Sequence, residues 1–522
     1  MKTNQDFNES LLTSGKNIPC WYDGKFPIEK YSVLNENLDT DVVIVGGGIS
    51  GCSVGYNLVQ AGFKVVIIED GLIGSGETGR TTAQLTTALE DRYYEMEELF
   101  GEQDTKLIAE SHKAAIDYVE SIVKKENIDC NFERVNGYLF RNETDNSDSL
   151  IRENIAATKA GINITPLVQV PGIPSELGSL CFADQAQFHP IKYILGLCKI
   201  IESKGGQIFN TTHASEIDYT GITTKEGFKV KAKHIVIATN APVNDKYSIM
   251  LKQWAYRSYV IAALIKKNIL PRAMWWDTGD HTIKESMPYH YVRLHEYNDS
   301  FDLLITGGED HPVGHDMEIS PENRYERLEK WTRKRFPIGQ VVSKWSGEVL
   351  VPMDALAYIG RNPWDRDNVY IITGDCGIGM THATIGGLLI ADLIAGKENK
   401  WEKIYSPKRF TLKSSGSVFR MLKEDLISVI KKWLYTDISK ADEIKSEEAK
   451  IIEIEGNKYG AFRDKSGFLH VVSAECTHLK CMVVWNGNEQ SWDCPCHGSR
   501  FTYTGQVING PANEDLPAYS PR

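Results

Sequence analysis

Apolar and polar positions first form a clear pattern at residues 41–51, where a short apolar run ends in three glycines and helical spacing follows. This order predicts a buried strand, a tight turn and the start of a helix. A second apolar run at residues 64–68 repeats the strand pattern and ends in Glu69. Because two such strands flank one helix, the pattern favours an α/β layer with a parallel sheet.

The same pattern predicts helices and strands along much of the remaining chain. Helical spacing fills residues 92–125, and Pro190 suits the first turn of a helix that runs to about residue 201. Further strands are predicted at residues 131–140, 231–238, 256–265, 289–294, 303–307 and 368–373, and further helices at residues 321–336 and 379–395. The order of strand, glycine turn and helix therefore recurs far from the first one.

This discontinuous layout predicts three folding units: an α/β nucleotide-binding domain, an α+β domain inserted into it, and a small all-β domain at the end. The nucleotide-binding domain would comprise residues 1–130, 182–250 and 345–400, and the inserted substrate domain residues 131–181 and 251–344. Residues 441–522 carry short strand patterns with Gly and Asn turns, which are typical of a separate β domain.

Residues 401–440 are expected to form a linker that contains an amphipathic helix. Its apolar positions recur at helical spacing and are Val418, Leu422, Leu426, Val429 and Trp433. Lysines mark the opposite face as solvated. Docking of the apolar face on the protein's own domains is the preferred interpretation, and a role at a membrane surface is the alternative.

Composition places the chain among ordinary globular proteins and argues against some partners. Of its 522 residues, 42% are hydrophobic and 25% are charged, and the net charge is -12. An acidic chain is a poor match for nucleic acid. No apolar stretch reaches the roughly 18 residues that an integral membrane segment needs, and the N-terminus lacks the apolar core of a signal peptide. We therefore expect a cytoplasmic protein.

The glycines of the first turn carry the first candidate chemistry. Gly46 permits the tight turn, Gly48 lets the backbone approach a pyrophosphate, and Gly51 lets the helix pack closely on the strand. Backbone N–H groups and the helix dipole then face two phosphates, and Glu69 can hydrogen-bond the ribose hydroxyls of an adenosine. These residues predict a dinucleotide cradle and leave FAD and NAD open.

A second glycine match, at residues 74–79, lacks a strand that runs directly into it. We interpret it as part of a loop and not as a second nucleotide site. The hydroxyl groups of Thr81 and Thr82, which follow this match, are expected to touch the same cofactor. A flexible loop without such a contact is the alternative.

Two short segments near the C-terminus combine cysteine with histidine, CTHLKC at residues 476–481 and CPCHGS at residues 494–499. They crowd four of the ten cysteines together, which favours a metal or redox site over a secreted disulfide framework. Thiolates and imidazoles suit iron–sulfur clusters and zinc alike, so ligand type leaves a structural zinc site open. The further cysteine in each segment, Cys481 or Cys496, could help to clamp the two loops together, which favours iron.

Residues 441–522 resemble the Rieske [2Fe-2S] family, and the sequence GPA at residues 510–512 matches the family's proline-bearing third loop. The resemblance implies a set of four cluster ligands. Two thiolates would bind one iron and two imidazoles the other, and these ligands are Cys476, Cys494, His478 and His497.

The resemblance also implies a disulfide between Cys481 and Cys496, as in members of the cytochrome bc type. Ser499 matches a hydroxyl that hydrogen-bonds cluster sulfur in high-potential members. Two positions depart from those members, because Phe501 stands where Tyr is frequent and Lys480 stands where Gly is usual. Since fewer hydrogen bonds stabilise the reduced cluster less, we predict a reduction potential below that of respiratory members.

Residues 41–400 resemble the D-amino-acid-oxidase-like FAD-dependent oxidoreductases, most closely the branch of amine and amino-acid oxidoreductases that includes gamma-glutamylputrescine oxidase. The resemblance rests on the cradle, on the loop at residues 74–82, and on the motifs FHP at 188–190, AT at 238–239, WSG at 345–347 and YIG at 358–360. It implies FAD as the tightly held cofactor, with a helix N-terminus at residues 377–381 near the flavin pyrimidine ring. Backbone N–H groups there would stabilise the negative charge of reduced flavin.

The residues expected to contact FAD come from the cradle, the loop after it and the second glycine turn. They are Gly46, Gly48, Ile49, Ser50, Gly51, Glu69, Asp70, Thr81, Thr82, Ala238, Thr239, Gly374, Gly377, Ile378, Gly379, Met380 and Thr381.

Candidate substrate contacts lie on an alternating segment of the inserted domain. Tyr289, Tyr291 and Arg293 would share one face of a strand that roofs the flavin. The arginine could clamp a substrate carboxylate and the phenols could enclose an amine, whereas an ordinary half-buried strand is the alternative. His382 and Cys376 flank the second glycine turn and could touch substrate, although such residues more often only pack.

These features together predict an oxidoreductase with two cofactors, FAD and a [2Fe-2S] cluster. The enzyme would oxidise a C–N bond of a small amine or amino acid and pass electrons through the cluster to an external one-electron acceptor. Two alternatives stay open. One is a reductase in which electrons run from cluster to flavin to an imine or activated double bond, and the other is a non-enzymatic redox relay or sensor that responds through Cys481 and Cys496.

Overall fold

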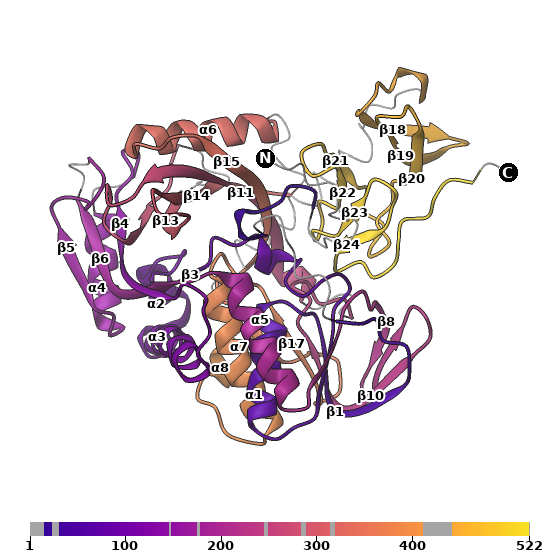
Figure 1. Cartoon of the computed structure of the whole chain (residues 1–522), viewed down its shortest axis with the longest axis horizontal. Coiled ribbons are helices and arrows are strands. Elements are labelled where there is room, and N and C mark those ends of the chain that lie inside the picture. The colour runs from indigo at the N-terminus through magenta and orange to yellow at the C-terminus, as the bar shows by residue number, and fades with distance from the viewer. Residues whose placement is uncertain are drawn as a thin grey trace.

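The structure is a computed structural model that describes residues 15–22, 31–145, 148–174, 178–244, 249–282, 289–313, 319–410 and 441–520. The amphipathic helix predicted around Leu426 lies outside these ranges. None of the described helices is both long and apolar enough to cross a membrane. Figure 1 shows sheets with helices packed around them, and a group of short strands, in yellow, near the C-terminus.

The first sheet has eight strands, and its central strands are parallel neighbours in the order β17-β10-β1-β2-β7. The strands are β1 Leu38–Val45, β2 Val65–Ile68, β7 Gln207–Phe209, β8 Ala214–Asp218, β9 Gly221–Thr224, β10 Lys229–Ile237, β16 Tyr358–Arg361 and β17 Val369–Thr373. Every residue of β2 and β17 is buried, which explains why their sequences are continuous apolar runs. Strands from three distant parts of the chain thus form one parallel core.

Three helices pack together beside this sheet. Helix α1 (Ile49–Gln60) contacts both α5 (Pro190–Ser203) and α7 (Gly379–Ile394). Helix α5 begins at its proline, and the ring of the preceding His189 accepts a hydrogen bond from the N–H of Lys192. Helices α1 and α7 each begin directly after a glycine turn, so both N-termini point to the same end of the sheet.

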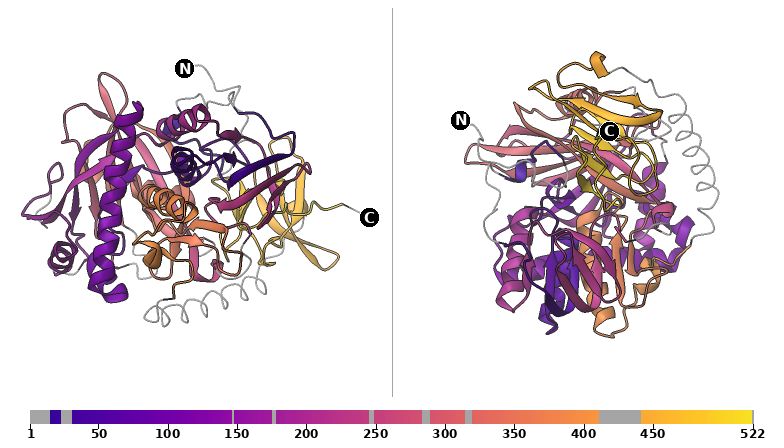
Figure 2. Two further views of the ribbon diagram at one scale, coloured as in Figure 1. Left: turned by 90° about the horizontal axis from the view of Figure 1, so that it is seen from below. Right: turned by 90° about the vertical axis from the view of Figure 1, so that its right-hand side faces the viewer.

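Residues 92–125, where helical spacing is predicted, form two helices in the structure. These are α2 (Tyr93–Phe100) and α3 (Glu102–Glu126), separated by Gly101 with φ 81° and ψ 164°. That conformation lies far from helical values. One glycine of this kind does not change the spacing of the apolar residues, so the break is not visible in the sequence pattern. Helix α3 is the long purple helix in the left-hand view of Figure 2. Two further short helices are α4 Ser149–Lys159 and α8 Glu402–Tyr405.

The second sheet has nine strands in the order β15-β11-β14-β13-β12-β4-β6-β3, with β5 paired to β6. They are β3 Gln84–Leu85, β4 Glu133–Phe140, β5 Ile164–Leu167, β6 Ser179–Gln187, β11 Gln253–Lys266, β12 Ala273–Asp277, β13 Tyr291–Glu296, β14 Phe301–Pro312 and β15 Val341–Pro352. Helix α6 (Pro321–Arg335) packs on β11 and β14, at the top of Figure 1. Strands β6 and β15 cross residues 182 and 345, where domain boundaries are predicted.

The C-terminal domain, residues 441–520, contains a three-stranded and a four-stranded antiparallel sheet. The strands are β18 Ala449–Ile454, β19 Asn457–Arg463, β20 Leu469–Ser473, β21 Val484–Asn486, β22 Ser491–Asp493, β23 Arg500–Thr502 and β24 Val507–Asn509. Its core includes Trp492 and Phe501, both fully buried. Figures 1 and 2 show this domain, in yellow, beside the two large sheets.

Buried charges join the C-terminal domain to the rest of the protein. Nη1 of Arg80 lies 3.1 Å from Oε1 of Glu489, and the two side chains are 2% and 0% exposed. The guanidinium of Arg257 lies 3.6 Å from Asp493 and 3.8 Å from Glu348, and all three side chains are buried. An unpaired charge at such a place is strongly destabilising, so these contacts specify how the domain docks.

Candidate functional site

A large cavity opens where the first and second sheets meet, and the predicted dinucleotide cradle forms one of its walls. Gly46 has φ 108°, and a Cβ there would lie 2.4 Å from the carbonyl oxygen of Ala238. A Cβ on Gly51 would lie 1.9 Å from the carbonyl oxygen of Gly46. Only glycine fits either position, which is the property that lets backbone N–H groups approach a pyrophosphate.

Most residues predicted to contact FAD line this cavity. They are Gly46, Gly48, Ile49, Ser50, Glu69, Asp70, Thr81, Thr82, Ala238, Thr239, Gly377, Ile378, Gly379 and Met380. The others lie behind the lining. Gly51 packs α1 on the turn, a Cβ on Gly374 would lie 2.6 Å from Pro352, and the hydroxyl of Thr381 accepts a hydrogen bond from the Thr86 N–H.

Glu69 stands at the end of β2, where an adenosine ribose is predicted. Its carboxylate accepts hydrogen bonds from the N–H groups of Gly47 at 2.6 Å and Gly71 at 3.0 Å. Burial raises the pKa of Glu69 to about 7. The neighbouring Asp70 lies 3.1 Å from the ring of His213. Glu69 thus braces the glycine turn as well as facing the cavity.

The loop after the cradle belongs to the same site and is not a second nucleotide motif. Residues Glu77–Gly79 form a short 3-10 helix, and the hydroxyl of Thr78 accepts the N–H of Ile49 at 2.9 Å. This bond ties the loop to the first turn of α1. Thr81 and Thr82 follow and line the cavity.

The N-terminus of α7 supplies a second helix end to the cavity. Ile378 precedes the helix, and the backbone at Gly377 and Gly379 lines the cavity wall. The free N–H groups and the positive dipole end there suit an anionic group. Two helix N-termini, from α1 and α7, therefore face one cavity, which fits a dinucleotide with phosphates and an electron-accepting ring.

The predicted substrate residues separate into two groups. Tyr289 and Tyr291 line the cavity, with ring centroids 5.4 Å apart. Arg293 does not line it, because its guanidinium donates to the carbonyl oxygens of Thr82, Ala83 and Phe188. Burial lowers the pKa of Arg293 to about 9. The guanidinium expected to bind a substrate carboxylate is thus already hydrogen-bonded to the backbone.

His382 also lies outside the cavity. Its Nδ1 is 2.9 Å from the carbonyl oxygen of Asp375, and its ring packs against His112 and Tyr405. Burial lowers the pKa of His382 to about 3. Cys376 faces a second, neighbouring cavity, and its thiol donates to Asp91.

Four residues that sequence patterns did not single out also line the cavity: Glu90, Ser258, Trp276 and Asp310. The side chain of Tyr289 hydrogen-bonds Glu90, and the hydroxyl of Ser258 hydrogen-bonds the hydroxyl of Tyr291. Burial raises the pKa of both Glu90 and Asp310 above the usual carboxyl value. They come from a loop and from β14, and only the tertiary fold brings them together.

The cysteine and histidine segments of the C-terminal domain form two facing loops. Cys476 and Cys494, one from each loop, are both buried. The rings of His478 and His497 lie 5.1 Å apart. Two thiols and two imidazoles from two loops are the donor set of a Rieske [2Fe-2S] cluster, so the residues present fit that group.

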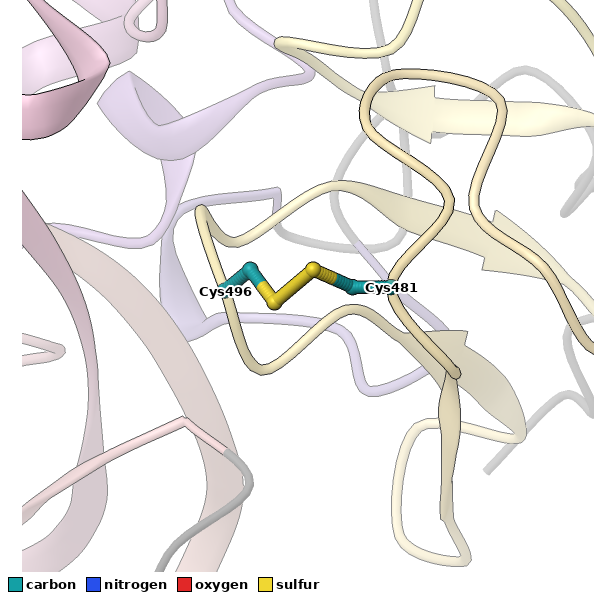
Figure 3. Close-up of a disulfide and its surroundings, with 2 residues drawn as sticks. All are labelled: Cys481 and Cys496. Atoms are coloured by element: carbon teal, nitrogen blue, oxygen red, sulfur yellow. A yellow bond between two sulfur atoms is a disulfide. The ribbon is translucent and has the colours of Figure 1, made fainter. Parts of the chain in front are cut away.

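The disulfide implied for Cys481 and Cys496 is present, with an S–S distance of 2.01 Å, and it joins the two loops in Figure 3. Within the described residues, the sulfur atoms of Cys481, Cys494 and Cys496 lie within 4.8 Å of one another. Two of these three sulfurs are bonded together, so this trio is not a separate metal site. Lys480, placed where the family usually has Gly, has φ 61°, the conformation that favours glycine.

The third loop of the C-terminal domain reaches the large cavity. The Ser499 hydroxyl accepts the N–H of Ala512 at 3.0 Å, which fixes this loop to the cluster loops. Asn509 donates to Glu348 at 2.9 Å, and residues 507–510, 512 and 513 line the cavity. A Cβ on Gly498, next to His497, would lie 2.5 Å from that of Ala255 in β11. The third loop of the C-terminal domain is therefore part of the cavity wall, and the cluster loop at residues 494–499 packs close to that wall.

A dinucleotide cavity beside a Rieske-type ligand set defines a redox protein with two centres. Residues 41–393 match the family of FAD dependent oxidoreductases (DAO), and residues 435–520 match the Rieske [2Fe-2S] domain. The chain belongs to this FAD-dependent oxidoreductase family and carries a C-terminal Rieske domain. The predicted fold class and both cofactors are confirmed, because the family binds FAD and the Rieske domain binds a [2Fe-2S] cluster.

Three similar proteins illustrate both parts. The Rieske 2Fe-2S iron-sulfur protein YhfW of Bacillus subtilis is 33% identical over 94% of this chain and 95% of its own. Gamma-glutamylputrescine oxidoreductase of Escherichia coli is 24% identical over 71% of this chain and 87% of its own. The crystal structure of glycine oxidase from Geobacillus kaustophilus, 21% identical, covers 72% of this chain and 100% of that chain with a TM-score of 0.58. The enzyme is therefore an oxidoreductase of this fold.

Proposed function

We propose that this protein oxidises a C–N bond of a small amine or amino acid and passes the electrons through its Rieske cluster to an external one-electron acceptor. The observation that carries the proposal is the shared wall, in which residues 507–510 of the Rieske domain line the cavity that contains the cradle. Bound FAD supplies two-electron chemistry and the cluster supplies one-electron steps. With the two sites next to each other, electrons taken up in pairs at the flavin would leave one at a time through the cluster.

The residues of the chain provide a binding surface for an amine at this cavity. Tyr289, Tyr291 and Trp276 present aromatic side chains, which attract cations and exclude water. Glu90 and Asp310 add carboxylates that can accept hydrogen bonds from an amino group. The similarity to gamma-glutamylputrescine oxidoreductase also supports an amine, although that name describes the other protein.

Electron flow out of the cavity would depend on the cluster ligands. His497 lies next to Gly498, which contacts β11 close to Glu348 of the cavity wall. The loop that carries this ligand therefore packs against the flavoprotein close to the cavity wall. Such packing favours transfer from the cavity to the cluster.

Rapid mixing under anaerobic conditions tests this proposal. Amines should bleach the flavin absorbance first and the cluster absorbance afterwards, and ferricyanide should then accept the electrons. The variant His497→Ala should keep the first phase and lose the second. His470→Ala is a matched control, because His470 is paired with Asp464 in the same domain and lies outside the cluster loops.

Two results would contradict the proposal. One is full turnover of His497→Ala with ferricyanide or with air, which would make the cluster dispensable. The other is reduction of the flavin only after the cluster has been reduced, with an imine as the oxidising substrate, which would establish the opposite direction of electron flow.

A further inference from the structure

A second cavity adjoins the flavin cavity on the substrate side. The two share part of their lining, and the shared residues are Glu90, Arg92, Tyr289, Asp310 and Val349. The second cavity, here called the acidic chamber, extends from these residues towards helices α2 and α4. The two cavities therefore meet at these five residues.

The chamber is named for the charge of its described lining. Six carboxylates belong to it: Glu90, Asp91, Glu95, Asp145, Glu153 and Asp310. Among the described lining residues, Arg92 is the single guanidinium, and it donates to the carbonyl oxygens of Leu89 and Asp277. His281 lies 3.2 Å from Asp145. The carboxylates therefore outnumber the positive charges by a wide margin.

Several of these carboxylates have buried oxygen atoms that accept no hydrogen bond. Glu153 is 1% exposed; its Oε2 accepts the N–H of Tyr93 at 2.7 Å, whereas its Oε1 has no hydrogen-bond partner. Oε2 of Glu90 and Oδ1 of Asp310 are likewise buried and have no hydrogen-bond partner. A buried oxygen without a donor costs free energy, and a cationic N–H group would satisfy it.

Burial also acts on the acidity of these groups. It raises the pKa of Glu153 to about 7 and that of Asp310 to about 6, against the opposing effect of nearby positive charges. A bound cation would favour the ionised carboxylates and lower these values again. An ammonium group bound in the chamber would thus hold these carboxyl groups in their ionised form.

We propose that the substrate is a diamine or polyamine, with one amino group in the flavin cavity and a second ammonium group in the acidic chamber. The inference rests on the proposed function and narrows its substrate class from amines and amino acids to polycationic amines. The position of Arg293 agrees with it, because that guanidinium is held by three backbone carbonyls and lies outside the flavin cavity. A substrate carboxylate would meet the same carboxylates that an ammonium satisfies.

Binding to the FAD- and cluster-loaded protein tests the proposal directly. Titration calorimetry would compare α,ω-diaminoalkanes of increasing length with the monoamines and the ω-amino acids of the same length. One additional charged hydrogen bond predicts that the best diamine binds at least about tenfold more tightly than its monoamine. The ω-amino acid should bind more weakly than the monoamine.

Two variants assign the effect to the chamber. Glu153→Gln and Glu95→Gln should each weaken diamine binding several-fold and leave monoamine binding unchanged. The side chain of Glu95 is exposed, so this second variant does not depend on a core residue. Glu98→Gln is the matched control, because Glu98 lies on the same helix, is 71% exposed and is outside the chamber lining.

The outcomes separate the two proposals. Equal affinity for diamines and monoamines, equal losses in the variants and the control, or no amine binding would overturn the chamber proposal. Diamine binding that depends on Glu153 but never bleaches the flavin would contradict the proposed function and leave the chamber assignment in place.

Discussion

Removal of one carboxylate, that of Glu489, should release the Rieske domain from the flavoprotein. Glu489 is completely buried, and its two oxygens accept hydrogen bonds from Arg80 at 3.1 Å, Ser346 at 2.6 Å and the N–H of Asn17 at 3.1 Å. Glu489→Ala would leave the guanidinium of Arg80, 2% exposed, without its counter-charge. The loss for such a broken buried pair is about 3–5 kcal/mol.

The dependence of this contact on pH has a definite sign. Burial alone would raise the pKa of Glu489, but the charges of Arg80 and Arg500 outweigh burial and hold the pKa below its usual value. A carboxyl whose pKa is lower in the folded state stabilises that state above the unfolded pKa of about 4.3. The stabilisation is lost as pH falls through the folded-state pKa, so docking should weaken in acid.

Urea titration of the loaded protein, followed separately by cluster and flavin circular dichroism, measures the loss. In Glu489→Ala the cluster signal should change at lower urea than the flavin signal. Asp515→Asn is the control, because Asp515 pairs with Lys225 across the same interface but the two are 42% and 62% exposed. An exposed pair contributes less than about 1 kcal/mol, so this variant should behave like the original protein.

A double replacement tests the physical reason. Arg80→Met with Glu489→Met removes both charges and keeps similar volumes, so docking should be largely restored. If Glu489→Ala leaves both transitions unchanged, or if the double variant is as weak as the single one, the buried charge is not what holds the domain.

Three further predictions concern the two cofactor sites. Gly51→Ala should lower the flavin content of purified protein severely, because its Cβ would lie 1.9 Å from the Gly46 carbonyl oxygen; a normal ratio of flavin to protein absorbance would contradict this. Replacing Cys481 and Cys496 by Ser opens a loop with a sequence separation of 15 and should cost about 3 kcal/mol, seen as a lower melting temperature of the cluster absorbance; no shift would count against it. Phe501→Tyr should raise the cluster potential by about 40 mV, the equivalent of one hydrogen bond of about 1 kcal/mol; a potential that is unchanged or lower in redox titration would oppose the idea.

Much of the fold and of both cofactor sites could be predicted because the relevant signals are local. A buried parallel strand needs a continuous apolar run, and a phosphate-binding turn needs glycine at fixed spacing. Residues 41–51 can therefore be recognised from the sequence alone. The cluster ligands are equally local, since each loop carries its cysteine and histidine within three residues. Such features depend on neighbours in the chain, and in the structure they lie in one cavity and in two facing loops.

The substrate side could not be predicted in the same way, because its residues are brought together by strand pairing. Arg293 has the spacing of a substrate residue, but the register of β13 places its guanidinium against backbone carbonyls. Glu90 and Asp310 have no distinctive spacing, yet β14 and the loop before α2 bring them to one wall. Contacts between distant segments leave no periodic signal that a single sequence could reveal.

Buried ion pairs between the Rieske domain and the flavoprotein bear on how the two redox centres are positioned. A buried ion pair adds little net stability over an apolar pair, but it strongly penalises any arrangement that leaves one charge unpaired. The contacts of Arg80 with Glu489 and of Arg257 with Asp493 cross from the flavoprotein to the Rieske domain and so constrain its orientation. That orientation places the third Rieske loop in the cavity wall. The interface therefore constrains the geometry between the two redox centres, at the expense of stability that apolar contacts would have supplied.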